Sequence, residues 1–124
     1  MSTILLVEDD AWMGDCYALW LQADGHTVLR AGDAQAALDV LDEQPVDAIV
    51  LDVLLPHANG IQLLHTLRSH ADFARLPVVL CSGSLPADLP PLHAYGVHGV
   101  IDKAKVGPQS FRQTIREVLN HAAV

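Results

Sequence analysis

The stretch AIVLDVLLP, residues 48–56, sets one carboxylate, Asp52, directly after an unbroken run of aliphatic residues. Such a run is too short for a helix and suits a strand of a parallel sheet, whose two faces are both covered. The segment after Asp52 is rich in loop-forming residues, with a proline, an asparagine and a glycine before position 61. The stretch therefore predicts a buried strand over residues 46–51 that ends in a carboxylate.

Four more apolar runs resemble this one, and they predict strands over residues 4–7, 27–31, 76–81 and 99–101. Between the runs, apolar residues recur at helical spacing. This spacing predicts helices that begin at residue 10 or 11 and end at 24, and that cover residues 33–44, 60–70 and 109–121. Asp33 is the expected N-cap of the second helix, and Gly25 is the expected end of the first.

Strands that alternate with helices need right-handed crossovers, which produce a parallel sheet with helices on both faces. The pattern alone allows either doubly wound strand order. A chain of 124 residues without a linker or repeat predicts a single domain over residues 1–124. Three prolines in residues 84–95 prevent a long regular helix there, so we expect about five helices, of which the fourth is short or irregular.

Composition excludes several classes of function. The formal net charge is -8, with seven lysines and arginines in all, which argues against direct binding of nucleic acid. No apolar run is long enough to span a membrane, and the first residues lead into a strand instead of a signal peptide. We therefore expect a cytoplasmic protein, in which Cys16 and Cys81 are free thiols.

Polar residues follow four of the predicted strands at their carboxyl ends, where ligands collect in open α/β sheets. They are Glu8, Asp9 and Asp10 after the first strand, Asp52 after the third, Ser82 after the fourth and Lys103 after the fifth. Clustered carboxylates suit a hard divalent cation such as Mg²⁺. A carboxylate beside a metal and an ammonium can accept a phosphoryl group. Asp52 is then the acceptor, and Ser82 and Lys103 contact the phosphoryl oxygens.

Each of these residues also has a simpler interpretation. The three acids after the first strand could merely favour the positive end of the next helix. Asp52 could cap a loop, and a lone lysine is usually a surface residue. Their joint placement after four different strands favours a site.

With these residues assembled, the chain resembles the receiver domain of bacterial two-component response regulators. Four segments carry the resemblance, which covers essentially the whole chain: ILLVEDD, LDVLLPHANG, PVVLCSG and GVHGVIDK. The resemblance selects the flavodoxin-like strand order 2-1-3-4-5.

The resemblance implies that Asp52 accepts a phosphoryl group from a histidine kinase or histidine phosphotransferase. It implies a magnesium site made by Asp9 directly, Glu8 through water and the main-chain carbonyl of Leu54. Ser82 and Lys103 would bind the phosphoryl group. The protein would then signal by a conformational change to a protein partner or output domain, and it would catalyse no reaction beyond its own phosphorylation and dephosphorylation. A start at Met1 without a linker favours a stand-alone or N-terminal receiver.

The chain departs from the family pattern in three places. Val100 stands where the family has an aromatic switch residue, and Ala104 stands where a proline follows the lysine. The prolines of residues 84–95 fall on the face that receivers use for output and for homodimers, so this face differs from that of a typical receiver. A homodimer remains possible. These departures keep one alternative open, a degenerate receiver that acts as a phosphorylation-independent interaction scaffold.

Two other classes fit less well. A phosphatase of the haloacid-dehalogenase type needs a second aspartate two residues after the nucleophile, and this chain has Leu54 there. A flavin- or nucleotide-binding module needs a phosphate cradle of Gly, Ser or Thr after the first strand, where this chain has three acids.

Overall fold

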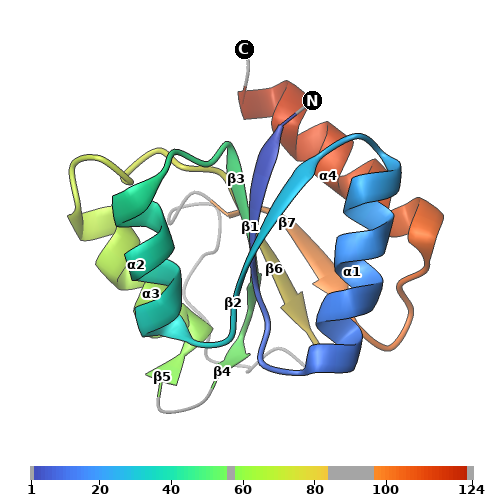
Figure 1. Cartoon of the computed structure of the whole chain (residues 1–124), viewed down its shortest axis with the longest axis horizontal. Helices are drawn as coiled ribbons and strands as arrows, with labels where there is room; N and C mark the ends of the chain where they lie inside the picture. Colours follow the sequence, from blue (N-terminus) through green and yellow to red (C-terminus); the bar gives the residue numbers. More distant parts are fainter. Residues whose placement is uncertain (1, 56–57, 84–96, 123–124) are drawn as a thin grey trace.

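A computed structural model describes residues 2–55, 58–83 and 97–122 (Figure 1). Its main sheet has five strands: β1 Thr3–Val7, β2 Thr27–Ala31, β3 Ala48–Asp52, β6 Val78–Ser82 and β7 Val97–Asp102. Neighbouring strands are all parallel, in the order β2-β1-β3-β6-β7. Numbered along the chain without the short strands β4 and β5, this is the predicted flavodoxin-like order 2-1-3-4-5.

Within the described ranges, four helices connect or follow these strands: α1 Ala11–Ala23, α2 Ala34–Glu43, α3 Gly60–Ser69 and α4 Pro108–Ala122. Their ends lie within one or two residues of the predicted ones. The Asp33 side chain accepts a hydrogen bond from the Ala36 N–H at 2.8 Å, which confirms it as the N-cap of α2. Gly25 has φ 87°, a left-handed conformation that suits glycine, and it ends the turn after α1.

The sheet lies between two helical layers, with α1 and α4 on one face and α2 and α3 on the other (Figure 1). Alternate residues of β3 point to opposite layers: Val50 packs in the core with α1 and α4, whereas Ile49 and Leu51 pack in the core with α2 and α3. Every residue of β3 is buried. This explains why its sequence is a continuous apolar run instead of an alternating one.

The structure differs from the predicted boundaries around β3. The strand begins later than expected and includes Asp52, because its ladder with β6 extends to the pair of Asp52 and Cys81. The segment predicted as a loop contains a short antiparallel pair, β4 Leu54–Leu55 and β5 Ala58–Asn59. The expected short or irregular fourth helix falls on residues outside the described ranges.

The structure also bears on the cysteines and on the expected lack of a membrane span. Cys16 and Cys81 are free thiols, as predicted. In the part of the chain that the structure describes, no helix is long and apolar enough to cross a membrane.

Candidate functional site

Three charged side chains emerge on one face of the sheet, at its carboxyl edge. Leu6, Val50 and Ile101 belong to the core between the sheet and the layer of α1 and α4. Side chains two positions apart in a strand share a face. The same face therefore receives the residue two positions after each of them, namely Glu8, Asp52 and Lys103.

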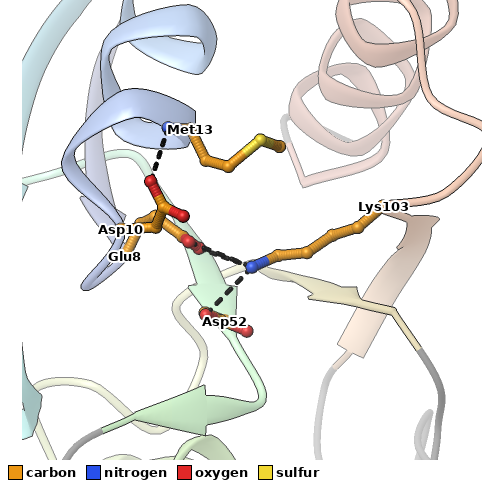
Figure 2. Close-up of polar contacts among 5 residues, drawn as sticks. All are labelled: Glu8, Asp10, Met13, Asp52 and Lys103. Carbon is orange, nitrogen blue, oxygen red and sulfur yellow. Dashed lines mark hydrogen bonds and ion pairs between the residues drawn. The ribbon is translucent and has the colours of Figure 1, made fainter.

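Lys103 joins the two carboxylates (Figure 2). Its Nζ atom donates hydrogen bonds to both carboxylate oxygens of Glu8 and to Oδ2 of Asp52, each at 3.0 Å. The side chains of Glu8 and Asp52 are 2% and 5% exposed, and that of Lys103 is 21% exposed. Taking two carboxylates out of water in this way requires a counter-charge, and the ammonium of Lys103 provides one.

Asp9 extends this cluster toward solvent. It is exposed, yet it offers a carboxylate oxygen that lies within 4.8 Å of oxygens of Glu8 and Asp52. Three carboxylates that converge in this way are the oxygen ligands that hard cations such as Mg²⁺ prefer. The donor chemistry at this edge therefore fits the predicted metal.

Asp10 has a different role from its two acidic neighbours. Its side chain turns to α1 and accepts a hydrogen bond from the Met13 N–H at 3.1 Å (Figure 2). Asp10 is thus the N-cap of α1, so the simpler interpretation of the acidic run is correct for this residue. The cap fixes where α1 begins. It thereby also limits the path of the backbone at Glu8 and Asp9, which connect β1 to α1.

Ser82 and Leu54 each lie near one member of the cluster, Ser82 across the sheet from Lys103 and Leu54 along the chain from Asp52. Ser82 is buried at the end of β6, and its carbonyl accepts a hydrogen bond from the Lys103 N–H at 3.0 Å. This bond holds the backbone of Lys103 against the neighbouring strand. Leu54 follows Asp52 by two residues and begins β4.

The turn after Lys103 depends on a residue that the sequence did not single out. The Asp102 carboxylate accepts a hydrogen bond from the Ala104 N–H at 2.9 Å, and its carbonyl accepts from Lys105 and Val106. An aspartate that binds the backbone two residues ahead is a recognised turn signal, so it could have been found. Val100, the residue at the switch position, is 44% exposed.

Glu8 is a weaker acid in this cluster than an ordinary glutamate. The pKa of Glu8 is raised from 4.5 to about 7, chiefly by burial and in addition by the charge of Asp52, while Lys103 partly opposes the rise. The folded protein therefore keeps a proton on Glu8 between pH 4.5 and about 7 that the unfolded chain releases.

Stability is accordingly expected to fall as the pH rises through this window, because the folded state binds more protons than the unfolded state. Between about pH 5 and about pH 7.5 the contribution of Glu8 should fall by about 2 kcal/mol. Urea unfolding at both values will measure it, with Glu8→Gln as the variant that lacks the titration. An identical pH dependence in both proteins would contradict the assignment to Glu8.

The chain is similar to a known protein family over most of its length. The model of the response regulator receiver domain family matches residues 4–116. The transcriptional regulatory protein CpxR of Escherichia coli is 41% identical over 68 residues, which are 55% of this chain and 29% of CpxR. The chain spans about a third of the length of the curated relatives it matches.

Solved structures agree with this match. A putative response regulator from Chloroflexus aurantiacus has a TM-score of 0.85 at 27% identity, over 96% of this chain and 98% of that one. A CheY-like response regulator receiver domain protein from Methanospirillum hungatei has a TM-score of 0.87 at 21% identity, over 99% and 97% of the two chains. The second likeness shows the shared fold alone.

Proposed function

Because the chain belongs to the response regulator receiver domain family, we propose that it is a phosphoacceptor domain that takes a phosphoryl group on Asp52. Receiver domains are signalling domains, not enzymes that act on a separate substrate. In the proposed transfer, a carboxylate oxygen of Asp52 attacks the phosphorus of a phosphohistidine. The bond from phosphorus to the histidine nitrogen breaks, and the nitrogen leaves with the electron pair.

The observation that carries this proposal is the position of Lys103. Its ammonium lies 3.0 Å from Oδ2 of Asp52, at a carboxylate that is 5% exposed. An ammonium in this place stabilises the negative charge of the free carboxylate. During transfer it can stabilise the negative charge on the phosphoryl oxygens instead. We assign Lys103 and the hydroxyl of Ser82 to these oxygens.

The acidic cluster suits a magnesium ion in the same reaction. We propose that Asp9 ligates Mg²⁺ directly, Glu8 through water and Leu54 through its main-chain carbonyl. When bound, the cation neutralises charge on the acceptor and the phosphoryl oxygens. Without it, three carboxylates and one ammonium leave an excess of negative charge, which would repel a phosphodonor.

We further propose that residues 1–124 form a single receiver domain, phosphorylated by a histidine kinase or histidine phosphotransferase. Its signal would pass to a downstream protein partner or output domain. Val100 has no ring that could turn inward on phosphorylation, and its side chain reaches the surface. The usual aromatic switch is therefore replaced by another conformational change, with a homodimer as one allowed assembly.

Incubation with acetyl phosphate and Mg²⁺ will test the proposal. We expect a mass gain of one phosphoryl group in the wild type and in Asp42→Asn, which changes an exposed aspartate of α2, and none in Asp52→Asn. Removal of Mg²⁺ by a chelator should prevent the gain. If the wild type gains no mass at saturating donor, the degenerate-receiver alternative is favoured instead.

A further inference from the structure

Tyr17 lies in the core between the sheet and the layer of α1 and α4. Its side chain is 0% exposed. Its ring stacks on Phe111 of α4 with centroids 4.8 Å apart and planes 7° from parallel, and it meets Trp20 at 5.5 Å. Within the described residues its hydroxyl is buried and has no hydrogen-bond partner.

This hydroxyl lies on the same side of the sheet as the acidic cluster. Tyr17 shares its core with Cys81, which pairs with Asp52 across β3 and β6. The pKa of Tyr17 is raised, first by burial, and the negative charges of Glu8 and Asp52 add to the rise. The phenol is therefore protonated at neutral pH, and it is a hydrogen-bond donor on the side of the sheet that holds the cluster.

A buried hydroxyl without a partner is unfavourable, because it loses its hydrogen bonds to water and gains none. Phenylalanine would fill the same space against Phe111 without this penalty. The hydroxyl of Tyr17 is therefore explained best if it finds an acceptor in another state of the site.

Phosphorylation would create such a state. Lys103 supplies hydrogen bonds to both oxygens of Glu8 in this structure. A phosphoryl group on Asp52 adds negative charge that attracts the same ammonium. When Lys103 moves toward it, Glu8 loses two hydrogen bonds while its side chain remains almost wholly buried.

We propose that Tyr17 is a positioning residue that donates a hydrogen bond to Glu8, directly or through one water, when the phosphoryl group on Asp52 engages Lys103. This inference rests on the proposed function. It gives Glu8 a replacement donor in the phosphorylated state, and it links that state to the stacked pair of Tyr17 and Phe111.

Beryllofluoride, which mimics a phosphoryl group on a carboxylate, will test the inference in the full chain with Mg²⁺. Tyr17→Phe should leave the stability of the unmodified protein equal or higher. It should weaken beryllofluoride binding roughly tenfold, the effect of one lost hydrogen bond to a charged group. In a double-mutant cycle, the loss should be smaller in the Glu8→Gln background, because a neutral amide oxygen is a weaker acceptor than a carboxylate, whereas a cycle with Asp10→Asn, the helix cap, should show no coupling.

A spectroscopic measurement on the wild type tests the role of Tyr17 without the Tyr17→Phe substitution. Tyrosine labelled with ¹³C at the hydroxyl-bearing carbon gives two signals, from Tyr17 and Tyr95, which Tyr95→Phe distinguishes. The Tyr17 signal should shift when beryllofluoride binds.

The outcomes separate the two proposals. If the wild type binds no beryllofluoride, the proposed function fails. If it binds while the Tyr17 signal does not move and Tyr17→Phe binds equally well, the role of Tyr17 is overturned and the proposed function stands.

Discussion

Lys103→Met is expected to lower the free energy of unfolding by about 3 kcal/mol near neutral pH and to slow phosphorylation of Asp52 at least a hundredfold. Methionine keeps the apolar stem but removes the ammonium that joins Glu8 and Asp52. The two carboxylates are then left buried without their cation, so the pKa of Glu8 should rise above its wild-type value. Urea unfolding and the rate of mass gain with acetyl phosphate measure the two effects.

The matched control is Lys105→Met, which removes an exposed ammonium two residues further along the chain. It should leave both quantities nearly unchanged. Mg²⁺ should restore part of the stability lost in Lys103→Met, because a dication among the carboxylates supplies the missing positive charge. Equal stability of the wild type and Lys103→Met would show that the ion cluster does not hold this edge together.

Phe111→Ala is expected to lower the free energy of unfolding by about 4 kcal/mol. Phe111 is 0% exposed, stacks on Tyr17 and meets Trp20 with centroids 5.5 Å apart. Its removal leaves a cavity between α4 and α1, and the rigid rings on the other side cannot collapse to fill it. Urea unfolding followed by tryptophan fluorescence will report the change.

The comparison variant is Phe73→Ala, which truncates a half-buried ring at the edge of the opposite core. It should give a smaller loss because less apolar surface is exposed on truncation. A loss of less than about 1 kcal/mol for Phe111→Ala would mean that the aromatic cluster can repack.

The strands and the site were predictable from sequence for a common reason. A strand that is buried on both faces needs apolar residues at successive positions, as in residues 48–51. Such strands and their carboxyl ends can therefore be recognised in the sequence. Once the ends were known, the convergence of Glu8, Asp52 and Lys103 followed from the topology of a parallel sheet. The ion contacts in the structure confirm that these three residues meet.

Other features could not be derived in this way. The strand order needed the family resemblance, because both doubly wound orders satisfy the same local pattern. The separation of Asp10 from Glu8 and Asp9 depends on a single hydrogen bond to Met13, and all three acids look alike in sequence. Tyr17 looked like any other core residue, because helical spacing shows that a residue is buried without showing whether its polar atom is paired.

The ion cluster spans nearly the whole chain, since Lys103 and Glu8 are 95 positions apart and Lys103 and Asp52 are 51 apart. Its members come together only after β1, β3 and β7 have assembled into one sheet. Under the proposed function, a nascent, truncated or partly unfolded chain therefore has the aspartate but lacks the ammonium beside it, and we expect it to take up no phosphoryl group. Phosphate incorporation by a chemical donor can thus serve as an assay of folding yield, which counts correctly assembled molecules in a preparation.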